Sequence, residues 1–435
     1  MALRWADKTV EESTSTTTGA YQLGGVPSGS AAGSQTFVAG IGGGNTCYYE
    51  AEESGGSAYE RGIGTVADAT PDTLTRTTIH ASSNGGAAVD WTGKTVRVMC
   101  VMPAHAVRRA MLDHAGLLEN ITLVASRSGN AETIAVKTWA GADPSAADPV
   151  RVAFAKSDGG FEVLEITSAL SLTISSGSTL GAVNGTPFRV WVVLFNDAGT
   201  LRLGAIKCAL SDGVYGLQDN SVESSTAEGA AGGADSSGVI YTGTAVTSKV
   251  MRVLGYLEYT LTTAGTWDTA PSTIRLYGPG VRLPGEIVQT RRATTSSRVN
   301  VTVSTPLIDD SIPQNTEGVE VLTQAVTPRS ATSLMRVSAH AIGTIGAVTT
   351  MTLALYRDSV ANALGAAIST TSNANAYAIE GAVAISEQSP GTSAATYKLR
   401  IGKTNGDVYI NGSNSTTRIF GGVAATWLQV EEIAT

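Results

Sequence analysis

Charged and aromatic residues are scarce in this chain of 435 residues, where they make up 15% and 6% of the total. Helical proteins depend on Glu, Lys, Leu and Arg, so the low charge argues against a mainly helical fold. The chain is instead rich in glycine, with 49 residues, and in Val, Thr, Ser and Ala. This mixture is typical of short strands joined by tight turns. The composition predicts an all-β protein, and the length predicts several domains.

Cysteine and histidine, the usual ligands of structural zinc, are also rare. The three cysteines, Cys47, Cys100 and Cys208, form no closely spaced pair and lie in or beside apolar runs, so we expect buried free thiols. A disulfide between Cys47 and Cys100, or a bond between subunits, stays open as an alternative. None of the four histidines has a second histidine at a metal-binding spacing. The sequence therefore predicts no metal site and no cofactor.

Motifs of catalysis are missing as well. Residues 93–95 (GKT) resemble the end of a phosphate-binding loop, but the glycine required five residues earlier is Ala88. The chain has no Gly-x-Ser-x-Gly elbow. Adjacent acidic residues occur at 52–53, 309–310 and 431–432. Neighbours on a strand point to opposite faces, so the two carboxylates of such a pair do not face the same substrate. We therefore expect a protein that is not an enzyme and has no catalytic residues.

The net charge and the lack of long apolar segments argue against nucleic acid and membranes as partners. A net charge of -8 gives the chain no general basic surface, which argues against coating nucleic acid. No segment approaches the roughly 18 apolar residues that cross a bilayer, and the N-terminus lacks the apolar part of a signal peptide. We expect synthesis in a cytoplasm without membrane insertion. A role outside the cell then requires another export route, such as release within a particle.

Turn signals and two breaks divide the chain into three β-rich blocks. The predicted domains are residues 1–102, 118–284 and 304–435, joined by linkers at 103–117 and 285–303. Each domain is expected to be a β-sandwich or jelly roll, because its short strands are separated by turns. In the first block, strands are predicted at residues 35–41, 47–51, 73–80 and 95–102.

The first linker carries the clearest helix signal. Pro103 suits a first helical turn, and glycine is absent from the residues that follow it, up to Gly116. An apolar stripe at i, i+3, i+4 and i+7 is formed by Val107, Ala110, Met111 and His114. So short a helix is marginal alone. Two alternatives remain open: three copies pack side by side in a trimer, or the stripe packs on its own domain.

The middle and last blocks have distinct strand patterns. In the middle block we predict a hairpin of residues 152–155 and 161–166, a central strand at 188–195, a β-bulge at Gly204 and a surface loop at 221–238. In the last block, strands are predicted at residues 320–326, 334–342, 349–356, 377–385, 397–401, 408–410 and 428–433. No internal repeat is present, which argues against a propeller or solenoid.

Several segments resemble fibre proteins of tailed phages and prophages. In the first block these are residues 3–8 (LRWADK), 37–49, 61–65, 74–79 and 98–104. The middle block, through residues 173–181, 185–189 and 241–249, is similar to a domain that commonly follows. The last block, through residues 352–358 and 428–432, resembles small jelly-roll heads and the trimeric complement or tumour-necrosis-factor heads.

The resemblance implies an elongated homotrimer located in the virion. It would be a short tail fibre or spike that docks through its N-terminal domain on baseplate, neck, portal or capsid proteins and presents the head to a host glycan or protein. The docking candidates are Trp5, Phe37, Tyr48 and Tyr49. The receptor-contact candidates are Tyr356, Arg357, Asp358, Tyr377, Arg418 and Trp427. Two alternatives are an architectural head, collar or baseplate decoration without a receptor, and a polysaccharide-degrading tailspike. No catalytic residue carries over.

Overall fold

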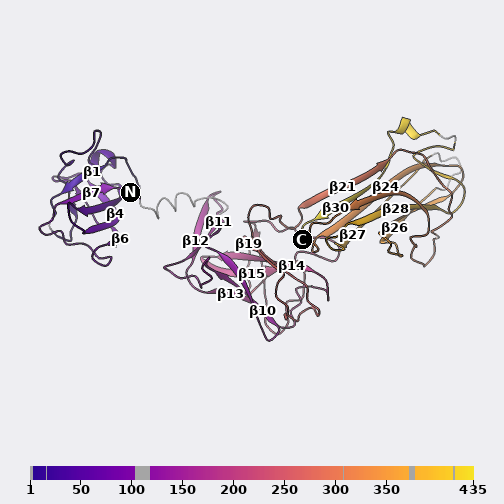
Figure 1. Cartoon of the computed structure of the whole chain (residues 1–435), viewed down its shortest axis with the longest axis horizontal. Helices are drawn as coiled ribbons and strands as arrows, with labels where there is room; N and C mark the ends of the chain where they lie inside the picture. The colour runs from indigo at the N-terminus through magenta and orange to yellow at the C-terminus, as the bar shows by residue number, and fades with distance from the viewer. Residues whose placement is uncertain (1–2, 16, 103–117, 307, 372–377, 415–416) are drawn as a thin grey trace. The chain divides into compact units, whose positions relative to one another are not determined.

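The computed structural model describes residues 3–15, 17–102, 118–306, 308–371, 378–414 and 417–435. Within these ranges the chain has thirty strands, a four-residue α-helix and a four-residue 3₁₀-helix, η1 (Ile419–Gly422) (Figure 1). The all-β prediction is therefore confirmed. The chain divides into two compact units, Met1–Asp113 and His114–Thr435. The described ranges contain no helix with the length and apolar character needed to cross a membrane.

The first unit is built on one seven-stranded sheet in the order β1-β7-β3-β4-β5-β2, with β6 paired to β4. Its strands are β1 (Val10–Ser13), β2 (Tyr21–Gln22), β3 (Thr46–Glu53), β4 (Tyr59–Ala67), β5 (Thr73–Leu74), β6 (Thr78–Ser82) and β7 (Val96–Cys100). Burial alternates along β4, as expected for a strand with one face on a core. That core contains the buried rings of Tyr21, Tyr49 and Trp91.

A short helix replaces the strand predicted at residues 35–41. Helix α1 (Phe37–Gly40) begins after Thr36, whose hydroxyl accepts a hydrogen bond from the Ala39 amide at 3.2 Å. The Glu11 carboxylate accepts from the Phe37 amide at 2.7 Å. These acceptors satisfy amides that a first helical turn leaves free. The strand prediction was wrong because a short apolar run does not distinguish a strand from one buried turn of helix.

The second unit begins with a β-sandwich built around a seven-stranded sheet, in the order β16-β19-β14-β15-β18-β17 with β20 on β19. Two three-stranded sheets, β13-β10-β9 and β12-β11-β8, complete this part. The strands are β8 (Leu118–Glu119), β9 (Thr122–Ser128), β10 (Ala131–Lys137), β11 (Val150–Ala155), β12 (Phe161–Ile166), β13 (Leu170–Ile174), β14 (Phe188–Asp197), β15 (Thr200–Ile206), β16 (Val222–Glu223), β17 (Thr226–Ala227), β18 (Tyr241–Thr242), β19 (Lys249–Tyr259) and β20 (Thr273–Leu276). The predicted hairpin is confirmed as β11 and β12, and the central strand as β14.

The continuous apolar run of β14 reflects burial on both faces. Val190 and Val192 belong to one core, whereas Trp191 and Val193 belong to another on the opposite face. Strand β15 likewise contributes to both cores, which explains its change of apolar phase at Gly204. The β-bulge predicted at that glycine is wrong, because β15 pairs with β14 without a register shift. The shift lies between β14 and β19 instead.

The second unit ends with another β-sandwich. A six-stranded sheet, in the order β21-β30-β24-β29-β22 with β27 on β24, faces a four-stranded sheet, β23-β28-β25-β26. The strands are β21 (Ile287–Thr295), β22 (Val299–Val301), β23 (Val319–Val326), β24 (Leu334–Ile345), β25 (Thr350–Arg357), β26 (Gly365–Thr370), β27 (Ile379–Gln388), β28 (Ala395–Lys403), β29 (Val408–Ile410) and β30 (Thr426–Ile433). The core between the sheets includes Val337, Leu353, Leu399 and Val430.

Residues 285–303 are part of this sandwich and not the predicted linker. Strand β21 pairs with β30 from Ile287 opposite Ile433 to Thr295 opposite Thr426, and β22 pairs with β29. Strand β21 is at the edge of its sheet and most of its side chains are exposed or half-buried, including Arg291 and Arg292. An edge strand tolerates such charges, so its sequence lacks the apolar alternation by which the other strands were predicted.

Candidate functional site

Hydrogen bonds hold the two sandwiches of the second unit together. The Gly285 amide donates to the Ala434 carbonyl and the Ala434 amide donates to the Glu286 carbonyl, both at 2.9 Å. The Trp191 indole, from β14 of the first sandwich, donates to the Thr435 backbone oxygen at 3.0 Å. This end of the chain is marked C beside β14 in Figure 1. The junction is therefore built from both sandwiches and from the connection between them.

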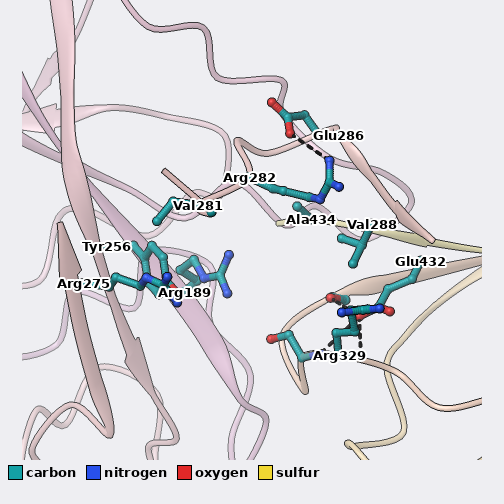
Figure 2. Close-up of a pocket in the computed structure, with 13 residues that line it drawn as sticks. Arg189, Tyr256, Arg275, Val281, Arg282, Glu286, Val288, Arg329, Glu432 and Ala434 are labelled. Atoms are coloured by element: carbon teal, nitrogen blue, oxygen red, sulfur yellow. Dashed lines mark hydrogen bonds and ion pairs between the residues drawn. The ribbon is translucent and has the colours of Figure 1, made fainter. Parts of the chain in front are cut away.

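A pocket of about 630 Å³ opens at this junction. Strands β14, β19 and β20 form one wall, the connection before β21 forms a second, and the loop before β24 with the end of β30 forms a third (Figure 2). Four of the lining residues are arginines. The full lining comprises Arg189, Tyr256, Arg275, Gly280, Val281, Arg282, Glu286, Val288, Arg329, Ser330, Ser333, Glu432 and Ala434.

Arg189 is an internal part of the wall. Its guanidinium donates to Glu258 with the closer contact at 2.7 Å, and its Cζ lies 3.9 Å from the centroid of the Tyr256 ring. A guanidinium that both pairs with a carboxylate and stacks on an aromatic face is held in one orientation. Arg189 thus positions Tyr256, and its own charge is balanced by Glu258.

Glu432 is the buried anion of the opposite wall. Its carboxylate accepts hydrogen bonds from the amides of Arg329 (2.8 Å) and Ser330 (3.1 Å), from the Ser333 hydroxyl (2.9 Å) and from the Gln289 amide group (2.7 Å). Four donors satisfy a carboxylate without using the side chain of any arginine. They also fix the backbone of the loop that carries Arg329.

The remaining charges differ in how they are paired. Arg282 forms an ion pair with Glu286 at 3.5 Å, on the second wall (Figure 2). The side chains of Arg275 and Arg329 have neither a hydrogen-bond nor an ion-pair partner among the described residues, and both residues are exposed. Two guanidinium groups of the pocket are therefore available to a ligand. Such groups bind carboxylate, phosphate or sulfate oxygens through paired N–H donors.

No local sequence signal points to this pocket. Its arginines come from four separate segments, at positions 189, 275, 282 and 329, and are brought together only by the contact between sandwiches. Within the described ranges there is no group of three or more His, Cys, Asp or Glu residues suited to hold a metal ion. The pocket's chemistry is therefore that of a cationic binding site.

The docking candidates fall into two groups. Trp5 is 56% exposed, whereas Phe37, Tyr48 and Tyr49 are buried, at 0%, 8% and 1% exposed. Tyr49 donates its hydroxyl to Glu60 at 2.7 Å, and Tyr48 lies 6.0 Å from the His80 ring. Three of the four side chains therefore belong to the body of the first unit, and among the four only Trp5 has an exposed ring.

Most receptor-contact candidates around β25 are occupied within the chain. Tyr356 is fully buried and donates to the Gln314 carbonyl at 2.9 Å, so it is a core residue. Arg357 pairs with Glu387 at 2.5 Å. Asp358 is exposed and accepts from the Thr396 amide at 2.7 Å, which stabilises a turn. The strand predicted at residues 349–356 is confirmed as β25, but its sequence did not separate core residues from surface residues.

The other candidates lie elsewhere on this sandwich. Trp427 is half-buried on β30, stacked 6.0 Å from His340 and 4.7 Å from the Arg292 guanidinium carbon. Arg418 is exposed just before η1. Tyr377 and the helix candidates at residues 107, 110, 111 and 114 lie outside the described residues.

The thiols of the first unit are neighbours. Cys47 and Cys100 are both free, as is Cys208. The neighbouring Cys47 thiol lowers the pKa of Cys100 to about 7, whereas burial raises the pKa of Cys208 above its usual range. Free thiols were the expected state.

Comparisons with known proteins leave the family open. No family model matches the chain, and no curated protein matches it. Among solved structures, Eiger TNF from S. frugiperda is 11% identical, with 35% of this chain and 94% of that chain covered and a TM-score of 0.19. The infectious bursal disease virus VP2 subviral particle is 13% identical, covering 73% and 78%, with a TM-score of 0.18. The Cry8Ea1 delta-endotoxin from Bacillus thuringiensis is 8% identical, covering 76% and 55%, with a TM-score of 0.17. At these scores the likenesses carry no argument about function.

Proposed function

We propose that this chain is a structural component of a tailed-phage particle, a short trimeric fibre or spike. In this proposal the first unit docks on the virion and the last sandwich presents a surface for attachment to the host. The observation that carries it is the compactness of the first unit. The segments with the most specific resemblance to fibre attachment domains, from residue 3 to residue 102, lie in a unit with its own sheet and its own core.

The exposed face of the six-stranded sheet is suited to contact between copies of the chain. Ser338 on β24 lies opposite Ala384 on β27, and Ala382 lies opposite His340. The side chains of Ser338, Ala382 and Ala384 are small, and the half-buried Trp427 lies opposite His340 in the strand register. A patch of small side chains beside an aromatic residue buries apolar area when three copies pack together. We place the trimer seam there.

The trimer is tested by analytical ultracentrifugation at micromolar concentration. The unmodified chain should sediment as a trimer, and Ala384→Arg should sediment as a monomer because it puts a large cation at the centre of the seam. Ala366→Arg is the matched control, since Ala366 is an exposed alanine on β26 of the other sheet. A wild-type monomer would remove trimerisation from the proposal, and dissociation by Ala366→Arg would remove the seam.

The role on the particle is tested by gold-labelled antibodies against the last sandwich, applied to intact virions. Label on the tail, together with lost adsorption after deletion of the gene, supports the attachment fibre. Label on the capsid or neck with normal adsorption supports an architectural decoration instead. Absence of the chain from purified particles would overturn both assignments.

A further inference from the structure

The junction pocket of the second unit combines a concave shape with two cationic groups that lack partners. We propose that it binds a ligand carrying a multi-oxygen anion, a carboxylate, phosphate ester or sulfate ester, through Arg275 and Arg329. This inference does not require the particle assignment, because it concerns binding by the purified chain.

The two arginines are carried by backbone that is already ordered. Arg275 lies on β20 and pairs with Tyr256 of β19 in the strand register. The amides of Arg329 and Ser330 are fixed by the buried carboxylate of Glu432. Each guanidinium therefore extends from a fixed anchor on a different wall (Figure 2). Because this backbone is already ordered, binding of a ligand to both arginines costs the protein little backbone entropy, which favours affinity.

The charges around these two groups are already balanced. Arg189 is paired with Glu258, and Arg282 with Glu286. The carboxylate of Glu432 is fully buried and satisfied by neutral donors. An entering anion consequently does not have to displace an internal ion pair before it reaches Arg275 or Arg329. This separates the pocket from an ordinary cluster of surface salt bridges, in which each arginine is already engaged.

The size and polarity of the pocket indicate the rest of the ligand. A volume of about 630 Å³ exceeds what one phosphate or sulfate ion fills and lies within the range of small-molecule sites. Three residues that carry hydroxyls, Ser330, Ser333 and Tyr256, also line the pocket. These features suit a hydrophilic molecule with an anionic substituent, such as an acidic saccharide. The chain as a whole carries a net charge of -8, so general attraction of anions does not account for binding here.

Calorimetric titration of the full chain at low ionic strength tests the proposal with four probes. These are a galacturonate trisaccharide, the matching neutral galactose trisaccharide, inorganic phosphate and inorganic sulfate. We expect the galacturonate to bind and the neutral sugar not to bind. If phosphate or sulfate binds more tightly than the galacturonate, the same site is supported and its ligand is a phosphorylated or sulfated molecule. Binding should weaken as NaCl is raised from about 0.05 to 0.5 M.

Arg275→Gln and Arg329→Gln should each lower affinity by about tenfold or more, since each removes a charged hydrogen-bond donor. Both variants should keep the wild-type melting temperature, because neither side chain has a partner among the described residues. Arg418→Gln is the control. Arg418 is also exposed, and it precedes the start of β30, whereas the pocket lies at the end of that strand. The proposal is overturned if no anion binds, if the neutral sugar binds as well, or if Arg418→Gln weakens binding equally.

Discussion

Glu60 in the first unit and Glu132 in the second are both 0% exposed, yet their surroundings differ. Glu60 accepts hydrogen bonds from the hydroxyls of Tyr21 and Tyr49, each at 2.7 Å, and from the Val89 amide at 2.8 Å. Its carboxylate also lies 3.3 Å from the Arg76 guanidinium, which is itself 5% exposed. Glu60 is therefore a fully partnered buried charge at the centre of a polar network.

Glu132 has no hydrogen-bond partner for either carboxylate oxygen within the described part of the chain. The nearest cation is Arg127, at 4.0 Å. Burial raises the pKa of Glu132 to about 7, and Arg127 offsets only part of that rise. The comparison shows that equal burial has opposite consequences. Where donors and a cation surround the carboxylate, its charge stabilises the folded state. Where they are missing, the ionised carboxylate destabilises the folded state, and the size of this effect depends on pH.

Glu60→Ala is expected to have the largest effect. It leaves Arg76 buried without its anion and two tyrosine hydroxyls without an acceptor, so the first unit should lose about 3–5 kcal/mol of unfolding free energy. Hydrogen exchange of the β3 and β4 amides in the full chain measures this locally. Glu52→Gln is the control, because Glu52 is an exposed carboxylate on β3. Wild-type exchange rates in Glu60→Ala would show that the network is not what stabilises this unit.

Glu132→Gln should have a smaller effect of the opposite sign. The folded-state pKa of about 7 lies above the ordinary value of 4.5, so the folded state holds its proton more tightly than the unfolded state. The associated stability is present below pH 4.5 and is lost as the pH rises toward 7. Above pH 7 the ionised carboxylate lowers the unfolding free energy by up to about 3 kcal/mol.

The glutamine variant should therefore be more stable than the wild type at pH 8 and close to it at pH 5. Exchange of the β9 and β10 amides at the two pH values reports the difference. Asp212→Asn, at an exposed acidic residue of the same unit, should leave it unchanged. An equal gain at both pH values would contradict the explanation by ionisation.

The sequence predicted the strands better than the sites. Alternating or continuous apolar runs located β14, β24 and β30, because the apolar pattern of each strand reflects which of its faces are buried. Edge strand β21 escaped prediction, since its partner β30 lies more than a hundred residues further along and its exposed side chains need not be apolar. Helix α1 escaped because its apolar run is too short to distinguish a strand from a helical turn, and because one of its two capping acceptors, Glu11, lies on a different segment.

The candidate site could not be predicted from the sequence either, because its residues are far apart in the chain. Arg275 and Arg329 stand in unrelated local contexts, and only the packing of two sandwiches makes them neighbours of one cavity. The resemblance to fibre proteins makes Tyr49 a docking candidate, and the place of Tyr356 at a strand end of the head makes it a receptor-contact candidate. Both are buried, with their hydroxyls bonded to Glu60 on the neighbouring strand β4 and to the Gln314 carbonyl, 42 residues away in sequence.

Two tyrosine variants extend the comparison of the two carboxylates to buried hydroxyl groups, with smaller expected effects on stability. Burial raises the pKa of both Tyr49 and Tyr259, so each hydroxyl is a neutral donor. Tyr49 donates to Glu60, whereas the Tyr259 hydroxyl has no partner among the described residues. Tyr49→Phe should cost about 1–3 kcal/mol, because it removes a hydrogen bond to a charged acceptor. Tyr259→Phe should be neutral or slightly stabilising, because it removes a buried polar group that is unsatisfied. Urea unfolding followed by hydrogen exchange in each unit measures both effects. Equal losses of unfolding free energy in the two variants would mean that burial alone, and not hydrogen bonding, determines how these hydroxyls affect stability.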